Sequence, residues 1–363
     1  MKRRAFISTA ATGLALSACT QNQSGSLASS SKKVRWRLAS SFPRSLDTLF
    51  GASDVVAEQV SKMTNGNFQI KVHPAGELVP PFEVMDAVQQ GSIQMAQSAS
   101  YYFIGKNPAF AFDSCVPFGM TSRQQSAWLH TGGGLELIHE LFSDFNIITF
   151  PSGNTGAQMG GWFKKEVHSM QDMQGLRMRI PGMGGKAMAR MGVAVQNIPG
   201  GEIYTALERG AIDATEWVGP YDDEQLGLHE VAPFYYYPGW WEPGPSLSFF
   251  VNLDEWNALP EDYKAVFKAA CRYAESNMQA RYDTQNPQAL ARILERGVKL
   301  RPFATEILDA AFDASQSLLE EYSSKDKSFE KVFTAWKKAK KQSFQWFGTT
   351  EATYAGYAFD KGK

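Results

Sequence analysis

The sequence predicts an α/β protein of two lobes, each a mixed, mostly parallel sheet flanked by helices. Its 363 residues are long enough for two domains of ordinary size. Strand and helix patterns alternate over residues 34–96 and again over residues 173–217, and such alternation is typical of parallel α/β lobes. A helical pattern that runs from Glu261 to about Gln288 is long enough to lie across both lobes.

Residues 1–19 are typical of an export signal rather than of the fold. A charged start (MKRR) precedes a mostly apolar stretch at residues 10–18 that is too short to span a bilayer. The sequence RRAFI is similar to a twin-arginine signal, and residues 16–19 (LSAC) resemble a bacterial lipobox, in which Cys19 becomes the lipidated first residue. Cleavage nearby and release of the protein is the alternative. Either way we expect a periplasmic protein, with the polar, Ser-rich residues 20–33 as a flexible tether.

The composition argues against several classes of partner. A formal net charge of −1 and the lack of a basic stripe argue against binding to nucleic acid or to an anionic membrane surface. Besides Cys19, the chain contains Cys115 and Cys271, and neither lies in a CxxC motif. An oxidising compartment permits a disulfide between them, and two separate buried thiols are the alternative.

The first lobe is expected to start at Val34. Strand and helix patterns follow one another at residues 34–40, 46–63, 68–72, 81–90 and 93–96. A later helical pattern, over residues 126–142, is interrupted by a glycine triplet at residues 132–134. The triplet lacks the GK[ST] ending of a phosphate loop, so we expect a break in the helix. A strand is expected at residues 146–150, before a glycine-rich connection to the second lobe.

The second lobe is expected to open with a crossover strand at residues 156–162 (GAQMGGW), which directs Gln158 into the cleft. Residues 173–217 then predict strand, turn, helix, strand, helix and strand. An apolar run at residues 246–251 predicts a strand that returns to the first lobe. A further strand is expected at residues 298–300, with helices after it.

These elements set the expected boundaries of the lobes. Lobe 1 comprises residues 34–154 and about 246–285, and lobe 2 comprises residues 155–245 and about 286–345 with the C-terminal helices. A basic run at residues 337–341 is expected on a solvated face of the C-terminal helix. A homodimer contact through this helix is the alternative.

Arg179 is placed where α/β sheets bind ligands. In an open α/β sheet the ligand lies beyond the carboxyl ends of the strands. Arg179 ends one predicted strand, and Glu216 and Trp217 follow another. A guanidinium presents a rigid fork that matches a carboxylate. The residues alone leave two interpretations for Arg179: a clamp for an acidic ligand, or a salt bridge at the surface or between the lobes, which is the more frequent role.

Residues 182–187 (GMGGKA) match the outline of a dinucleotide-binding fingerprint, G-x-G-x-x-A. However, Pro181 directly precedes them, and the segment lies in the middle of an exported chain. We therefore expect these glycines to let the backbone turn tightly beside a ligand.

Motifs in both lobes resemble one protein family. In the first lobe, residues 73–78 (HPAGEL) and 91–96 (GSIQMA) stand at the family spacing. In the second, residues 175–179 (GLRMR) are similar to a G-x-K-x-R strand, and residues 202–214 match E-x-Y-x-A-L-x-x-G-x-x-D-A. Over essentially the whole mature chain, the sequence resembles the solute-binding proteins of tripartite ATP-independent periplasmic (TRAP) transporters, of the DctP type.

The resemblance implies a type II-like periplasmic binding protein fold. In that fold two lobes are hinged, a long helix spans both, and the ligand is held between them and delivered to the membrane components of the transporter. Arg179 matches the arginine that clamps the ligand carboxylate in the family. Arg177 stands where the family more often has lysine, but on a strand it faces the opposite way from Arg179, so we expect no effect on the site.

A charge count constrains how this site could work. Glu216 and Glu242 each lie beside a tryptophan after a predicted strand. If both face the cleft, the two glutamates and a ligand carboxylate carry −3 and Arg179 returns +1. A closed cleft would then bury −2, at a cost on the order of several kcal/mol for each unpaired ion. Either the glutamates hold protons through raised pKa values, or a cation bridges them to the ligand; we favour the cation.

The resemblance supports the cation. Glu216 and Glu242 are arranged as in the branch of the family that binds 2-oxo or 2-hydroxy monocarboxylates through a bound ion. This similarity implies Gln158 and the backbone carbonyl of Trp217 as further oxygen ligands. Oxygen ligands favour Na⁺, Ca²⁺ or Mg²⁺ over zinc. The resemblance favours Na⁺, and Ca²⁺ is the alternative.

The predicted function is capture of a small monocarboxylate, a 2-oxoacid such as pyruvate, for a TRAP transporter. The residues expected to contact the ligand are Arg179, Gln158, Trp217, Trp241, Tyr101 and Asn154. The alternative function is that of an exported carbohydrate-active hydrolase that uses Glu216 and Glu242 as acid and base. The sequence has no serine nucleophile elbow, no paired catalytic histidine and no zinc pattern, so we expect a protein that is not an enzyme.

Overall fold

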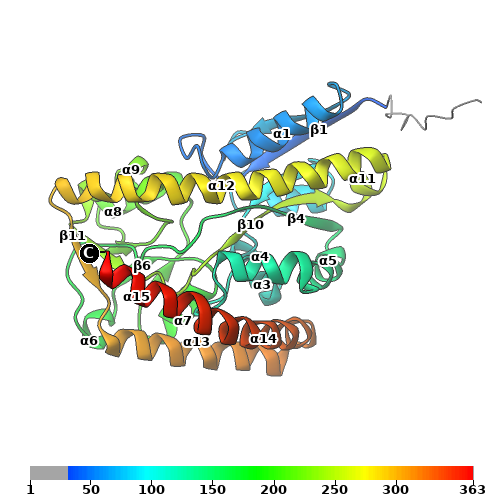
Figure 1. Ribbon diagram of the computed structural model, residues 1–363. Coiled ribbons are helices and arrows are strands. Elements are labelled where there is room, and N and C mark those ends of the chain that lie inside the picture. Colours follow the sequence, from blue (N-terminus) through cyan, green and yellow to red (C-terminus); the bar gives the residue numbers. More distant parts are fainter. Residues whose placement is uncertain (1–31, 363) are drawn as a thin grey trace, which may run out of the picture.

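Two α/β lobes lie side by side in the computed structural model, which describes residues 32–362 (Figure 1). The predicted signal peptide, most of the predicted tether and Cys19 lie outside these residues. Within the described part, the chain forms a five-stranded sheet and a six-stranded sheet, both mixed and flanked by helices. Helix α12 (Glu261–Glu295) runs across both lobes (Figure 1). The predicted fold class is confirmed.

Lobe 1 contains the five-stranded sheet, in the order β2-β1-β3-β10-β4. β1 pairs with β2 and β3 in parallel. The predicted return of β10 to lobe 1 is confirmed, and β10 lies antiparallel between β3 and β4. The strands are β1 (Val34–Ser40), β2 (Phe68–His73), β3 (Met95–Ser98), β4 (Ile147–Asn154) and β10 (Ser246–Asn252). The helices are α1 (Gly51–Met63), α2 (Val84–Gln89), α3 (Ala111–Ser114), α4 (Ser122–Thr131), α5 (Gly134–Ser143) and α11 (Leu253–Asn257).

Two helical patterns in lobe 1 can be compared with where the helices of the structure begin and break. The helix expected from residue 46 begins at Gly51, because residues 46–50 form turns whose Leu46 and Leu49 are buried. Their apolar spacing therefore marks the core rather than the helix. The predicted break at the glycine triplet is confirmed, since Gly133 takes a left-handed φ of 80° between α4 and α5.

Lobe 2 contains the six-stranded sheet, in the order β11-β9-β5-β8-β6-β7. β6 is parallel to β7 and β8, and β11 is parallel to β9, whereas β5 runs antiparallel between β8 and β9. The strands are β5 (Trp162–Phe163), β6 (Arg177–Arg179), β7 (Ala194–Gln196), β8 (Ala214–Thr215), β9 (Phe234–Tyr237) and β11 (Lys299–Pro302). The helices are α6 (Met170–Met173), α7 (Gly182–Arg190), α8 (Ile203–Glu208), α9 (Pro220–Gln225) and α10 (Leu228–Val231).

The crossover strand predicted at residues 156–162 is wrong. Residues 155–161 contain no helix or strand, and β5 begins only at Trp162. Gly156 (φ 72°) and Gly161 (φ 83°) take left-handed conformations, which an extended strand cannot contain. A Cβ on Gly161 would lie 2.4 Å from the carbonyl oxygen of Thr215, so this glycine lets the crossing segment pass close to β8.

Helix α12 ties the lobes together. It packs on α1 and β4 in lobe 1 and on α9 in lobe 2. In lobe 1 its Phe267 lies 5.2 Å, centroid to centroid, from Phe150 of β4. In lobe 2 the hydroxyl of Tyr282 donates a 2.8 Å hydrogen bond to Oδ2 of Asp222, a buried residue of α9. The helix continues past the predicted end near Gln288 to Glu295, with Pro287 inside it on an exposed face.

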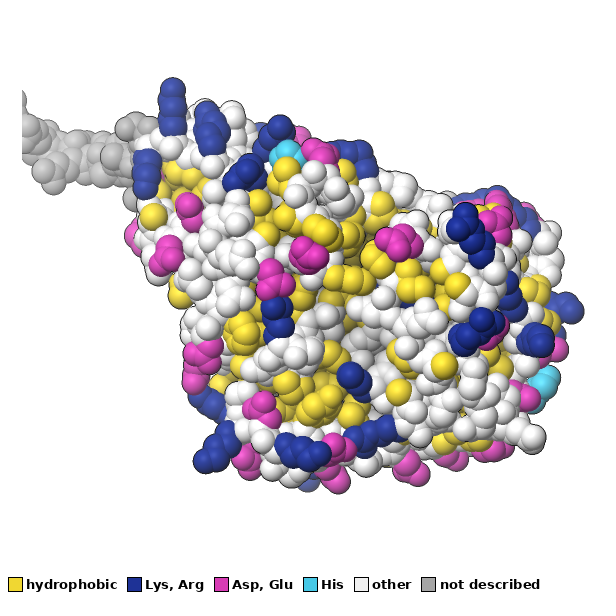
Figure 2. Space-filling view, turned by 180° about the vertical axis from the view of Figure 1, so that it is seen from behind, with side chains coloured by type: hydrophobic (Ala, Val, Ile, Leu, Met, Phe, Trp, Pro, Cys, Tyr) yellow, Lys and Arg dark blue, Asp and Glu magenta, His cyan; other side chains and the backbone are white. Residues whose placement is uncertain are grey.

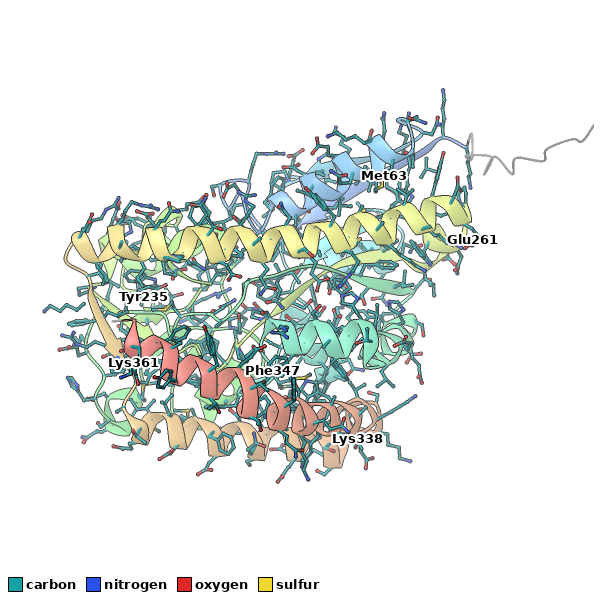
Figure 3. The ribbon with its side chains drawn as sticks, viewed as in Figure 1. Met63, Tyr235, Glu261, Lys338, Phe347 and Lys361 are labelled. Carbon is teal, nitrogen blue, oxygen red and sulfur yellow. The ribbon has the colours of Figure 1, made fainter. Side chains whose placement is uncertain are left out.

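The C-terminal helices divide between the lobes. Helix α13 (Thr305–Lys325) packs on α7 in lobe 2, whereas α14 (Lys327–Phe347) packs on α4 and α5 in lobe 1. The buried Trp336 of α14 lies 5.5 Å, centroid to centroid, from Phe112 in lobe 1. Residues 286–345 are therefore not confined to lobe 2 as expected, because the aromatic face of α14 completes the core of lobe 1. Figure 3 shows the chain continuing from Phe347 to Lys361 through α15 (Thr353–Lys361).

The core is continuous between the lobes. One cluster of buried apolar residues includes Trp36 and Phe267 on the lobe 1 side and Trp162 and Trp217 in lobe 2. Cys115 and Cys271 are free buried thiols, so of the two alternatives the disulfide is not formed. From behind, hydrophobic side chains gather along a hollow that crosses the middle of the molecule (Figure 2). In the part of the chain that the structure describes, no helix is both long enough and apolar enough to cross a membrane.

The contact between Tyr282 and Asp222 gives a test of how α12 holds lobe 2. Burial raises the pKa of Asp222 to about 7, so at pH 8 this carboxylate is charged and depends on its donor. Tyr282→Phe is expected to lower the free energy of unfolding at pH 8 by about 1–3 kcal/mol. Tyr273→Phe, on the same helix at a residue that is 53% exposed, is expected to change it by less than about 0.5 kcal/mol.

Urea denaturation of both variants checks this prediction. The Tyr282→Phe deficit is expected to shrink at pH 6, because Asp222 is then mostly protonated. Equal effects of the two substitutions at pH 8 would contradict it.

Candidate functional site

Arg179 and Glu216 lie together at the carboxyl ends of parallel strands. Arg179 is the last residue of β6, and Glu216 directly follows Thr215 of β8, which pairs with Arg179. This is the edge where α/β sheets bind ligands. Arg179 is 1% exposed, whereas Arg177 on the other face of β6 is exposed and pairs with Asp213 at 2.6 Å. The predicted opposite orientation of the two arginines is confirmed.

The guanidinium of Arg179 is held from several sides. Its Nη1 pairs with the carboxylate of Glu216 and donates to the Glu216 carbonyl oxygen at 3.2 Å. Its Nε donates to the carbonyl oxygen of Ile198 at 3.0 Å, and its Cζ lies 5.0 Å from the ring centroid of Trp217. The buried Nη2 has no acceptor among the described residues. One end of the fork is therefore fixed by the protein, and the other can donate to a further anion.

Glu242 enters the same site from residues 238–245, the segment that carries the chain back to lobe 1. It is 3% exposed, and the hydroxyl of Tyr101 in lobe 1 donates to its Oε2 at 3.3 Å. The backbone N–H of Gln158 donates to the carbonyl oxygen of Glu242 at 3.2 Å. This hydrogen bond joins residues 155–161 to residues 238–245, the two crossing segments between the lobes. Nε2 of Gln158 donates to Oγ1 of Thr155 at 3.1 Å, while its Oε1 is buried without a donor within residues 32–362.

Burial controls the charge of both glutamates. It raises the pKa of Glu216 to about 7, although the guanidinium of Arg179 acts in the opposite direction. Burial and the neighbouring Glu216 together raise the pKa of Glu242 well above its ordinary value. Near neutral pH the two carboxyl groups therefore keep part of their protons. A cation placed between them would favour their charged forms and displace those protons.

A small, partly open cavity lies beside these groups. Its lining residues come from both lobes and from the crossing segments: Phe42, Leu49, Tyr101, Tyr102, Thr155, Gln158, Arg179, Trp217, Val218 and Leu247. Its volume is only about 10 Å³, far below the usual range for sites that hold drug-sized molecules, about 300–1,000 Å³, so the space between the lobes favours the smallest acids. Aromatic and aliphatic walls exclude water and strengthen the polar contacts inside.

Two residues expected to contact the ligand do not line this cavity. Trp241 is 1% exposed and packs against Trp240 and Phe303, with ring centroids 5.0 and 6.1 Å away. Asn154 uses both ends of its amide on backbone: Nδ2 donates to Gly244 at 3.0 Å, and Oδ1 accepts from the N–H of Gly156 at 2.9 Å. Asn154 thus holds the crossing segments together. The structure brings together the other expected residues, Arg179, Gln158, Trp217, Tyr101, Glu216 and Glu242.

Sequence reasoning missed Tyr102, which lines the cavity beside Tyr101. Both tyrosines belong to a 3₁₀ turn (Ser100–Phe103) that begins just after β3 ends at Ser98. The signal for Tyr102 was its place, since it follows the carboxyl end of a parallel strand. Helical or strand periodicity could not have found two adjacent side chains that share one cavity.

The glycines at the start of α7 bring lobe 2 close to lobe 1. Gly182 has a left-handed φ of 64°, and a Cβ there would lie 3.1 Å from Cβ of Tyr101. At Gly184 a Cβ would lie 2.6 Å from Cβ of Trp241. Gly182 therefore allows tight packing between the lobes beside the cavity, whereas Gly184 allows α7 to pack closely on the segment 238–245.

The residues present fit a hard cation. Among residues 32–362 no cluster of three or more His, Cys, Asp or Glu side chains is arranged to hold a metal ion. The site instead offers two carboxylates, from Glu216 and Glu242, and the amide oxygen of Gln158. That oxygen is a buried acceptor without a donor, which a cation would satisfy. Carboxylate, amide and backbone oxygens are the ligands that Ca²⁺ takes in proteins.

The sequence matches a known family along most of its length. Residues 39–326 match the family described as bacterial extracellular solute-binding protein, family 7 (DctP). The chain is also 52% identical, over 361 residues and 99% of each chain, to a protein of Nostoc sp. (strain PCC 7120) named monocarboxylate 2-oxoacid-binding periplasmic protein.

The fold is similar to those of solved TRAP solute-binding proteins. The protein from Bordetella bronchiseptica RB50 is 45% identical with a TM-score of 0.90, covers 91% of this chain and 98% of its own, and was solved as a mixed-occupancy dimer with copurified calcium and picolinate. The protein from Pseudoalteromonas atlantica T6c is 39% identical with a TM-score of 0.87, covers 90% and 99%, and was solved with bound sodium and pyruvate.

These similarities confirm the family that the sequence motifs indicated. The match to the family spans more than half of the chain, and the relative from Nostoc is similar along nearly all of it. The chain belongs to the DctP family of bacterial extracellular solute-binding proteins.

Proposed function

We propose that this protein captures a short 2-oxo monocarboxylate, such as pyruvate, in the periplasm and delivers it to the membrane components of a TRAP transporter. The observation that carries the proposal is the buried guanidinium of Arg179, which lines the cavity and keeps Nη2 without an acceptor in the described part of the chain. A ligand carboxylate would accept from it. The name of the Nostoc relative and the pyruvate bound in the Pseudoalteromonas protein support this class of ligand.

A bridging cation completes the proposed site. Glu216, Glu242, Gln158 and the backbone carbonyl of Trp217 would hold it, and the ion would supply positive charge between the glutamates and the ligand. Ca²⁺ would balance the charge count fully, and Na⁺ would leave one negative charge. The solved relatives contain one ion each: calcium with picolinate, and sodium with pyruvate.

Ligand capture is proposed to work by closure of the two lobes. Tyr101 and Tyr102 belong to lobe 1, and Arg179 and Trp217 belong to lobe 2, so a ligand in the cavity would touch both. Such a ligand stabilises the closed state by its differential affinity. The proposed hinge comprises residues 155–161, the segment 238–245 and helix α12, three of the segments in which the chain passes between the lobes.

The alternative of a carbohydrate-active hydrolase has less support. Glu216 is paired with Arg179 and is 1% exposed, so it is poorly placed to act as an acid or base on a sugar. The family to which the chain belongs is one of solute-binding proteins for transport, not of enzymes.

A homodimer through the C-terminal helices is also proposed. The last helices expose a series of aromatic side chains: Phe344, Trp346, Tyr354, Tyr357 and Phe359. Such exposed apolar side chains are typical of an interface. The Bordetella protein was solved as a dimer, which supports this assembly. Lipid attachment at Cys19 stays a prediction from the sequence.

Arg179→Lys tests the proposed clamp. It keeps the charge beside Glu216 but removes the planar fork, so the affinity for pyruvate is expected to fall roughly 10- to 100-fold. Arg177→Lys, two residues away on the exposed face, is the matched control and is expected to keep wild-type affinity. Isothermal calorimetry measures both. Equal affinities in the two variants would contradict the clamp, and conversion of pyruvate to a product would contradict the binding function itself.

Removal of cations tests the bridging ion. In sodium-free buffer with a chelator, the affinity for pyruvate is expected to fall sharply, and Ca²⁺ or Na⁺ added separately is expected to show which ion restores it. Restoration is expected to be weaker at pH 6 than at pH 8, because Glu216, with a pKa raised to about 7, is then mostly protonated. Unchanged affinity without cations would refute the bridging role.

A further inference from the structure

A second hollow lies beside the central cavity, on the other side of two tyrosines. This outer groove runs between the turn after β3 in lobe 1 and the start of α7 in lobe 2. Its lining residues are Tyr101, Tyr102, Ile104, Gly105, Ile180, Pro181, Gly182, Gly185, Lys186, Ala189, Val195 and Asn197. Tyr101 and Tyr102 line both hollows. Their rings therefore form the partition between the central cavity and the outer groove.

The two tyrosines are held differently. Tyr101 is held by two contacts: its hydroxyl donates to Glu242, and Gly182 packs against its Cβ. Tyr102 is half-buried and lies edge-on to Tyr101, with ring centroids 5.0 Å apart. On its other side it meets Phe82 of lobe 1, also at 5.0 Å. Tyr102 is therefore the member of the partition whose ring can be removed without breaking the contact to Glu242.

Charge and packing hold the Tyr102 ring in place as a wall. Burial raises its pKa to about 12, while Arg179 opposes the shift because the guanidinium lies beside the phenol. The hydroxyl thus stays protonated at neutral pH, and the uncharged ring forms part of the cavity wall.

Polar and apolar surface line the outer groove about equally, and an aliphatic chain would pack against its wall in lobe 2. Most of the side chains that line it in lobe 2 are apolar, among them Ile180, Pro181, Ala189 and Val195. Polar groups come from Lys186 and Asn197. Burial of a methylene group against apolar side chains is favourable, so this wall would favour each added carbon of an unbranched tail.

We propose that Tyr102 sets the upper limit on the chain length of the bound acid. Its ring closes the central cavity to a short 2-oxoacid, and without the ring the cavity opens into the outer groove, which accepts the aliphatic tail of a longer 2-oxoacid. This inference rests on the proposed function, because it assumes that Arg179 holds the carboxylate of the acid.

The experiment compares pyruvate with 2-oxohexanoate by isothermal calorimetry in the presence of Ca²⁺ and Na⁺. The wild-type protein is expected to bind pyruvate more tightly, and Tyr102→Ala is expected to raise the affinity for 2-oxohexanoate relative to pyruvate at least about tenfold. Tyr102→Phe keeps the ring and is expected to keep the wild-type preference. Phe82→Ala is the matched control: it removes a ring that touches Tyr102 but lines neither hollow.

The outcomes separate the inference from the function. If the wild-type protein binds pyruvate but Tyr102→Ala gains nothing for 2-oxohexanoate, the inference is wrong and the function stands. A wild-type protein that binds both acids equally, or a Phe82→Ala variant with the same gain, also overturns the inference. If the wild-type protein binds no pyruvate, the proposed function fails and the inference fails with it. Should Tyr102→Ala not fold, as judged by its thermal melt, Tyr102→Leu removes the ring with a smaller loss of volume and is subject to the same outcomes.

Discussion

The burial of two carboxyl groups and one guanidinium at the junction of two lobes is the constraint on which the site depends. Glu216 and Glu242 are 1% and 3% exposed, and Arg179 can neutralise only one of them. A buried charge without a partner is costly. The protein alone meets this cost by raising the pKa of both glutamates. In the proposed function a cation would displace these protons and a ligand carboxylate would bind beside it, which links the electrostatics of the site to that function.

The fold explains why these three groups meet. Arg179 and Glu216 stand at adjacent strand ends of lobe 2, where the register of β6 and β8 fixes their separation. Glu242 comes from a segment that crosses between the lobes, and its partner Tyr101 comes from lobe 1. The site is therefore complete only when the lobes are together. Helix α12 and the hydrogen-bonded crossing segments connect the two lobes. Close packing at Gly182 places Tyr101 of lobe 1 next to the start of α7 in lobe 2.

Sequence patterns predicted most of the fold, because alternation and periodicity report which faces are buried. They predicted the two lobes, the return strand β10 and the helix α12 that spans both. They failed at the expected crossover strand, because the left-handed conformations of its glycines give an irregular segment instead. In the site, the charge count led to the prediction that Glu242 is an ion ligand, which stays a prediction, and the structure buries its carboxyl group near that of Glu216. However, Tyr102 and the structural use of Asn154 depend on contacts between distant segments, which spacing along the chain does not encode.

The most direct test of the central claim is to count the protons released when the ligand and cation bind. Titration of the metal-free protein with pyruvate and Ca²⁺ at pH 7, in buffers of different ionisation enthalpy, gives this number. Because the raised pKa values of Glu216 and Glu242 leave both partly protonated, binding is expected to release protons, and Glu242→Gln is expected to release fewer. Binding that releases no protons, or that takes protons up, would show that protonated glutamates, not a cation, balance the charge of the site.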